Sequence, residues 1–186
     1  MINSDKIIGI MGGTFNPIHK GHTGIARCAY EQSDIDEILF MPLGTPAYKD
    51  NSPIVSATDR CNMVKLAIKP FDYMSLSTIE TDRPGNTYTA DTLAQIYDSY
   101  KKIYFIIGAD SLLYIQDWYH PEYICSHCHL LCANRDNNSA SVLIDQKHFL
   151  ADKYGAVIDF IDVPELPYSS TDIRKKVAMG LSVKED

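Results

Sequence analysis

The sequence predicts an open α/β fold, in which helices cover both faces of a doubly wound parallel sheet. Short apolar runs without polar alternation recur along the chain, as is typical of strands that are buried on both faces. Segments with helical spacing lie between these runs. Strand and helix therefore alternate, which implies βαβ units with right-handed crossovers and a ligand site at the carboxyl ends of the strands.

Each predicted strand is an apolar run, and three of the runs stop at a residue that breaks regular structure. The first run stops at Gly12 and Gly13, the second at Pro42 and the third at Gly108. The predicted strands are residues 7–11, 38–41, 103–107, 130–133 and 157–161.

The predicted helices lie between the strands and carry start or stop signals. Ser56 followed by Asp59 is a pattern that caps a helix start, and Gly155 is a residue at which helices commonly end. The predicted helices are residues 23–30, 59–68, 89–100 and 140–154.

The composition narrows the class of protein. A chain of 186 residues, 45% of them hydrophobic and 22% charged, suits one domain over residues 1–186. A net charge of -7 excludes the broad basic surface that a nucleic-acid-binding protein needs. No run is long enough to span a bilayer and no secretory leader is recognisable, so we expect no membrane association and a cytoplasmic protein. The five cysteines imply no disulfide framework.

Residues 12–22, GGTFNPIHKGH, join the first predicted strand to the first predicted helix. The glycine pair lets the backbone approach a ligand closely, and a helix start offers unpaired N–H groups to an anion. The glycine spacing matches neither the dinucleotide fingerprint nor the P-loop. His19 and His22 can face one ligand together. The segment indicates a phosphate site, although an isolated pair of histidines at this spacing would more often cap or pack a helix start.

A second polar segment, residues 168–176 with the sequence YSSTDIRKK, lies near the end of the chain. Hydroxyl groups and backbone N–H groups at a helix start point outward, and Arg174 one turn inside can reach a phosphate with its fork of donors. Taken alone, this pattern would be an ordinary capped helix with a basic, solvated face.

Together the two segments resemble the HxGH and SSTxIR motifs of the nucleotidyltransferase superfamily, and the sequence is most similar to the bacterial nicotinate mononucleotide adenylyltransferases. The family pattern GGTFDPIHxGH is matched by residues 12–22, RPGxSYTxDTL by residues 83–93, and IGAD-x-L by residues 107–112 with Trp118 beyond. The resemblance covers nearly the whole chain. It implies a Rossmann-like nucleotidyltransferase fold.

The sequence departs from the family pattern at a few positions. Asn16 replaces the usual aspartate, and Thr87 replaces a serine. Where the family often has PPHK, Lys49 is kept and Tyr48 replaces the histidine, whose role is therefore not carried over. The chain also ends before the family's usual C-terminal segment, so it is a fragment, part of a longer fusion or naturally short.

The resemblance implies that the 5′-phosphate of nicotinate mononucleotide attacks the α-phosphorus of ATP, with Mg²⁺ carried by the triphosphate rather than by protein side chains. It implies catalytic roles for His19, His22, Lys49 and Arg174. ATP contacts are implied for Gly12, Thr14, Phe15, Gly108, Asp110, Arg135, Ser170 and Thr171. Contacts to nicotinate mononucleotide are implied for Thr87, Tyr88 and Trp118. The sequence leaves a homo-oligomer open.

Three alternatives remain at this point. One is another adenylyltransferase of the superfamily, with nicotinamide mononucleotide or pantetheine phosphate as the acceptor. The second is a nucleotide sensor without enzymatic activity, against which the intact pair of His19 and His22 argues. The third concerns Cys125, Cys128 and Cys132, whose spacing and neighbouring histidines permit a structural zinc site.

Overall fold

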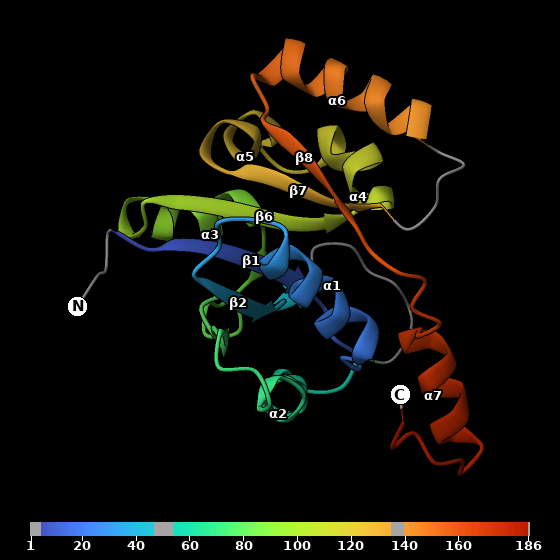
Figure 1. Cartoon of the computed structure of the whole chain (residues 1–186). Helices are drawn as coiled ribbons and strands as arrows, with labels where there is room; N and C mark the ends of the chain where they lie inside the picture. The colour runs from blue at the N-terminus through green and yellow to red at the C-terminus, as the bar shows by residue number, and fades with distance from the viewer. Residues whose placement is uncertain (1–4, 47–53, 135–139, 186) are drawn as a thin grey trace.

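The computed structural model describes residues 5–46, 54–134 and 140–185. Its centre is a six-stranded sheet in the order β4-β2-β1-β6-β7-β8, in which every neighbouring pair is parallel (Figure 1). The strands are β1 (Ile7–Gly13), β2 (Glu37–Pro42), β4 (Met74–Leu76), β6 (Lys102–Gly108), β7 (His129–Asn134) and β8 (Ile158–Asp162). Two short strands, β3 (Thr45–Pro46) and β5 (Asn86–Thr87), form a separate parallel pair.

This strand order reverses direction between β1 and β6, which are neighbours although about 90 residues separate them. In the register of this pair Ile8 lies opposite Ile103 and Ile10 opposite Phe105. Connections leave β1 and β6 toward opposite sides of the sheet at such a reversal, so a crevice forms at the carboxyl ends of these two strands. Gly13 ends β1 there and Gly108 ends β6.

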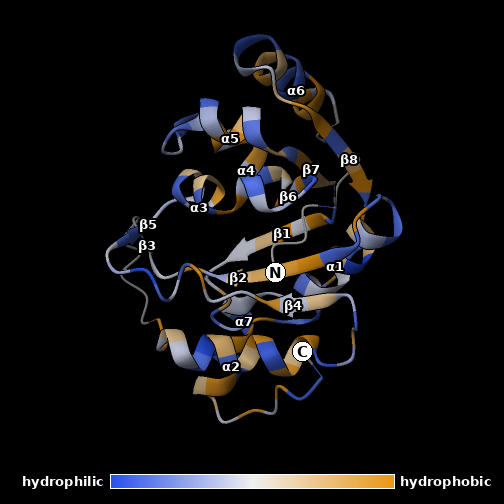
Figure 2. Ribbon diagram, turned by 90° about the vertical axis from the view of Figure 1, so that its left-hand side faces the viewer, coloured by the Kyte–Doolittle hydropathy of each residue, from blue (hydrophilic) through white to orange (hydrophobic). Residues whose placement is uncertain are grey.

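Helices pack against both faces of the sheet, and Figure 2 shows α2 and α5 alternating between hydrophilic and hydrophobic residues. One core combines Ile25 of α1 and Val64 of α2 with the strands, and the other combines Leu93 of α3 and Leu143 of α6 with the opposite face. The helices are α1 (Lys20–Glu31), α2 (Ala57–Ile68), α3 (Thr89–Ile96), α4 (Ala109–Tyr114), α5 (Pro121–His127), α6 (Ala140–Tyr154) and α7 (Ser170–Ala178), with 3₁₀ turns η1 (Tyr97–Ser99) and η2 (Ile115–Asp117).

The structure confirms the predicted fold class, all five strands and all four helices. The predicted cap of α2 is present, because the Asp59 N–H donates to Ser56 Oγ at 3.1 Å. The predicted end of the third helix at residue 100 is wrong, because α3 stops at Ile96 and a 3₁₀ turn follows. Asp98 lies in this turn, and aspartate has a low helix propensity. The short elements β3, β4, β5, α4 and α5 were not predicted, since two to seven residues carry little periodicity.

Candidate active site

The loop between β1 and α1 crosses the carboxyl end of the sheet. The Leu43 N–H after β2 donates to Gly13 O at 2.9 Å, which ties the ends of β1 and β2 together. Phe15 adopts a left-handed conformation, with φ of 49°, and its ring is 98% buried against Phe40 and His22. A bulky residue in this conformation costs about 1–3 kcal/mol, which the packing of its ring offsets. The loop therefore has one defined shape that depends on the core beneath it.

The two histidines lie side by side at the start of α1, with their ring centroids 3.8 Å apart. His19 is the residue before the helix and is 8% exposed. Its backbone N–H donates to Nδ1 of His22 at 3.2 Å. Because Nδ1 accepts this bond, the proton of the neutral His22 ring belongs on Nε2, which can then donate to a ligand oxygen. His22 therefore caps the helix and also offers a donor.

The C-terminal motif lies against the loop of the histidines. Arg174 Nη1 on α7 donates to Asn16 O at 2.8 Å, and Ser170 Oγ donates to Pro17 O at 2.8 Å. Arg174 Nη2 also donates to Thr171 Oγ1 at 3.2 Å. The structure thus brings together two segments that lie about 150 residues apart in the sequence. In this state the guanidinium of Arg174 holds the loop.

Two cavities open at the carboxyl ends of β1 and β6, and they share a wall. The first has a volume of about 240 Å³ and the second about 170 Å³. His22 lines the second cavity, together with Gly108. The shared wall consists of Gly12, Phe105, Ser111 and Trp118. Two adjoining spaces at the switch point suit two ligands that must meet.

Of the three predicted acceptor residues, Trp118 lines both cavities, whereas Thr87 and Tyr88 line neither. Trp118 packs edge-on against Phe105, with the ring centroids 6.1 Å apart. Tyr88 precedes α3, and its ring lies tilted by 35° against that of Tyr119, with the ring centroids 4.5 Å apart. Thr87 is 5% exposed and does not line the first cavity, whereas Thr89 at the start of α3 does. Within residues 87–89, the threonine that lines the cavity is therefore Thr89 and not the predicted Thr87.

Three of the predicted ATP residues line the two cavities. Gly12 and Thr14 line the first, and Gly108 lines the second. Gly108 also precedes α4, whose first turn contains Asp110. The predicted residues Lys49 and Arg135 lie outside the described part of the chain.

Sequence reasoning missed several polar residues beneath these cavities. Arg60 of α2 is 2% exposed, and its guanidinium donates to Thr14 O at 2.8 Å, Gly44 O at 3.2 Å and Val55 O at 3.3 Å. Burial lowers the pKa of Arg60 from its ordinary value, but a guanidinium stays charged. A charged residue inside an amphipathic helix is normally solvated, so no sequence signal marked Arg60 as buried. The missed residues that line the first cavity are Glu80, Thr89, Thr92 and Ser111.

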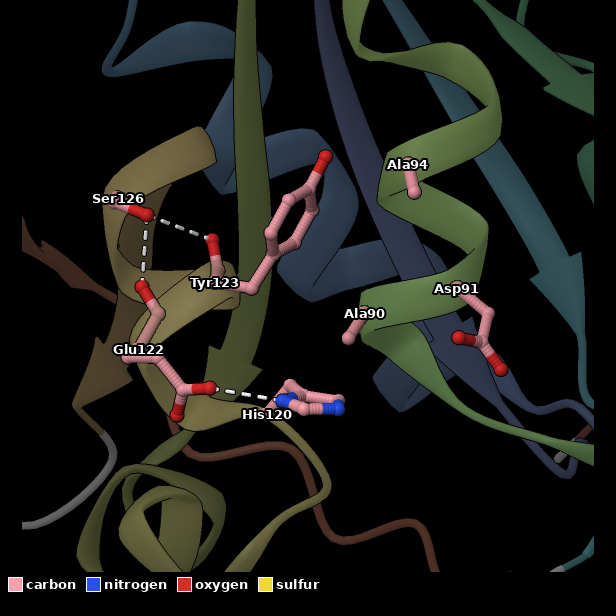
Figure 3. Close-up of a pocket in the computed structure, with 7 residues that line it drawn as sticks. All are labelled: Ala90, Asp91, Ala94, His120, Glu122, Tyr123 and Ser126. Atoms are coloured by element: carbon pink, nitrogen blue, oxygen red, sulfur yellow. Dashed lines mark hydrogen bonds and ion pairs between the residues drawn. The ribbon is translucent and has the colours of Figure 1, made fainter.

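A larger cavity of about 410 Å³ lies between α3 and α5, away from the predicted site residues. Figure 3 shows Ala90 and Ala94 of α3 facing Tyr123 of α5 across it. A hydrogen bond of 2.8 Å between His120 Nδ1 and Glu122 Oε1 lies at its edge. This cavity presents no cation or backbone loop suited to a triphosphate.

The cysteines at 125, 128 and 132 are buried. Burial raises the pKa of the Cys125 thiol to about 11 and that of Cys132 to about 12, and it raises the pKa of Cys128 as well. Thiolate, the form that binds zinc, is therefore disfavoured. Within residues 5–46, 54–134 and 140–185, no group of three His, Cys, Asp or Glu side chains could hold a metal ion. In the same ranges no helix is long and apolar enough to cross a bilayer.

Comparisons with known proteins agree with the fold and with the family that the sequence resembles. The model of the cytidylyltransferase-like family matches residues 10–176. A curated protein of Lachnoclostridium phytofermentans, named "Probable nicotinate-nucleotide adenylyltransferase", is 40% identical over 95% of this chain and 90% of its own length. A protein of Clostridium botulinum with the same name is 40% identical over 92% of this chain and 86% of its own.

Solved structures show the same fold at low sequence identity. The nicotinic acid mononucleotide adenylyltransferase of Plasmodium falciparum complexed with APC superposes with a TM-score of 0.73 at 20% identity, over 97% of this chain and 88% of that one. The same enzyme complexed with NaAD gives a TM-score of 0.72 at 20% identity, over 97% and 86% of the two chains.

Proposed function

This chain belongs to the nicotinate-nucleotide adenylyltransferases, within the cytidylyltransferase-like family, and we propose that it joins the adenylyl group of ATP to nicotinate mononucleotide, giving deamido-NAD and pyrophosphate. The observation that carries the proposal is the pair of cavities at the ends of β1 and β6. They adjoin through Gly12, Ser111 and Trp118, and His22 lines one of them. ATP occupies the side of His22 and the mononucleotide the side of Thr89.

The acceptor needs no strong base in this reaction. The second pKa of a phosphate monoester is about 6, so the 5′-phosphate is already ionised at neutral pH. Catalysis then consists of aligning the two substrates and stabilising the charge that develops on the phosphoryl oxygens. The donor at Nε2 of His22 supplies such stabilisation, because Nδ1 is held by the backbone.

The remaining polar groups surround the triphosphate. We assign Lys49, Arg174 and His19 to its charges, and the backbone N–H groups of the loop to its oxygens. The described residues offer no cage of carboxylates, so we assign Mg²⁺ to the ATP phosphates, whose charge it neutralises.

The nicotinate ring stacks on Trp118 in this proposal, and its carboxylate meets the start of α3 near Tyr88 and Thr89. The positive end of the helix dipole and the unpaired N–H groups there favour a carboxylate over a neutral amide. Loss of one charge-assisted hydrogen bond corresponds to about 1.5–3 kcal/mol, or roughly 10- to 100-fold in rate.

The test measures pyrophosphate release from ATP and Mg²⁺ with nicotinate mononucleotide, nicotinamide mononucleotide or pantetheine phosphate as the acceptor. We expect release with the nicotinate form to exceed release with the nicotinamide form by roughly 10- to 100-fold. Equal rates would refute the acceptor assignment while leaving adenylyl transfer in place. Release only with pantetheine phosphate would refute the acceptor class altogether.

A further inference from the structure

A chain of buried hydrogen bonds lies beneath the first cavity. Glu80, 6% exposed, accepts a hydrogen bond at Oε1 from Thr92 Oγ1 at 2.8 Å. Thr92, 2% exposed, accepts in turn from Arg83 Nη2 at 3.0 Å. A hydroxyl has one proton, and the shorter of its two contacts, 2.8 Å to Glu80 against 3.3 Å to Tyr88 O, identifies the carboxylate as its acceptor. The donors therefore run in one direction, from Arg83 through Thr92 to Glu80.

These bonds close the segment on which the proposed acceptor site is built. This segment comprises residues 83–92, so that Arg83 begins it and Thr92, in the first turn of α3, ends it. The bond between them joins the two ends of residues 83–92, which contain Tyr88 and Thr89. Glu80 and Thr92 also line the first cavity, together with Thr89. A change at Glu80 therefore acts on the start of α3 from below.

The loop after β2 is packed closely against the cluster of polar residues formed by Glu80, Arg83, Thr87 and Thr92. A Cβ added to Gly44 would lie 2.2 Å from Glu80 O and 2.6 Å from Thr87 Oγ1, so no side chain fits at this position. Immediately after Gly44, β3 pairs with β5, the strand that contains Thr87. The cluster consequently connects residues 83–92, the proposed acceptor segment, to the ends of β1 and β2. The proposed phosphate loop, residues 12–22, lies there.

The cluster contains more buried polar groups than its internal bonds satisfy. Within the described residues, Glu80 Oε2, Arg83 Nε and Nη1, and Thr87 Oγ1 are buried and have no hydrogen-bond partner. Burial raises the pKa of Glu80 above its ordinary value, although the bond from Thr92 and the charge of Arg83 oppose this. Unsatisfied buried groups are rare and costly, so their concentration beside one cavity calls for a functional reason.

We propose that Glu80 is a positioning residue for the acceptor: through Thr92 and Arg83 it holds the start of α3 where the mononucleotide binds. This inference rests on the proposed function, because it concerns the acceptor side of that reaction. Glu80 touches neither reacting phosphate in this account. Its loss should therefore weaken binding of the mononucleotide while leaving binding of ATP, which lies on the side of His22, unchanged.

The experiment measures kcat and the KM of each substrate for Glu80→Ala, Thr92→Val and Thr92→Ser. We expect Glu80→Ala and Thr92→Val to raise the KM for nicotinate mononucleotide about tenfold and the KM for ATP less than about twofold. Thr92→Ser keeps the hydroxyl and should stay within about twofold of the wild type. Should the first two variants fail to fold, Glu80→Gln, which keeps size and one acceptor oxygen, should raise the mononucleotide KM alone, by about threefold.

The matched control is Glu37→Gln at the opposite end of the sheet. Glu37 also accepts from a hydroxyl and lies beside a cation, with Ser75 Oγ at 2.6 Å and Lys6 Nζ at 2.6 Å. The Glu37→Gln variant should lower the stability of the protein without changing the KM of one substrate more than that of the other. Equal increases in both KM values for the Glu80 and Thr92 variants would overturn the positioning role, as would a KM split in Glu37→Gln. A wild type that does not use nicotinate mononucleotide would instead overturn the proposed function, and this inference with it.

Discussion

Arg60 links α2 to the phosphate loop, and replacing it with methionine should destabilise the protein and impair catalysis together. The guanidinium donates three hydrogen bonds to backbone carbonyls, from Thr14 at 2.8 Å to Val55 at 3.3 Å. A hydrogen bond to a charged group contributes about 1.5–3 kcal/mol to stability. Methionine also removes the cost of burying the charge, which offsets part of the loss of these bonds. Methionine fills similar space, so we expect a net loss of about 2–4 kcal/mol.

The assay is thermal unfolding followed by circular dichroism, with kcat measured on the same samples. For a chain of this size the expected loss lowers Tm by roughly 5–15 °C. A shift of the Thr14 carbonyl moves the loop that we propose binds the triphosphate, so kcat should fall by about 100-fold. The control is Arg27→Met, because Arg27 is 54% exposed and pairs with Glu31 only at 3.8 Å. It should change stability by less than about 0.5 kcal/mol.

Two results would refute this reasoning about Arg60. A Tm within about 2 °C of the wild type, with activity lost, would show that Arg60 contacts substrate rather than holding the loop. Unchanged kcat in a destabilised variant would show that the position of Thr14 does not depend on α2.

Three further predictions concern the site and its surroundings. His22→Ala should lower kcat by about 100-fold or more while the circular dichroism spectrum stays unchanged. The control variant His148→Ala, at an exposed position, should keep the wild-type kcat. Normal turnover in His22→Ala would remove His22 from the catalytic assignment. Trp118→Ala should raise the KM for the mononucleotide, and an effect on the KM for ATP alone would reverse the assignment of the two cavities. Burial raises the pKa of Glu37, but bonds from Lys6 and Ser75 outweigh it and hold that pKa below 4.5. The contribution of Glu37 to the free energy of unfolding is therefore present above about pH 4.5 and is lost as the pH falls through the lower pKa of the folded state. Urea titrations should show the difference in stability between the wild type and Glu37→Gln disappearing in acid. A difference that stays constant with pH would contradict the lowered pKa.

Most of the fold followed from local patterns in the sequence. The five predicted strands are apolar runs, and the three that stop at a glycine or proline have strands that end at Gly13, Pro42 and Gly108 in the structure. The capped helix at Ser56 was predicted for the same reason, because a cap is a bond between residues three apart. The edge strand β4 was not, because its three residues become a strand only by pairing with β2.

The candidate site, like the fold, was predicted only in the parts that have a local sequence pattern. The sequence by itself marked the phosphate loop and the segment around Arg174, because backbone approach and helix starts have local signatures. It did not reveal that Arg174 binds the backbone of that loop, or that Arg60 does so from α2.

Polar residues that become buried only when other elements pack over them carry no local signal in the sequence. Glu80, Thr92 and Arg83 are ordinary polar residues in the sequence, and only the folded packing removes them from water and bonds them to one another. The free energy of a buried polar group depends on neighbours supplied by other elements, such as Gly44 after β2. Strands, caps and the phosphate loop were thus determined by neighbouring residues, whereas the tertiary structure decided which charges became buried and what they hold in place.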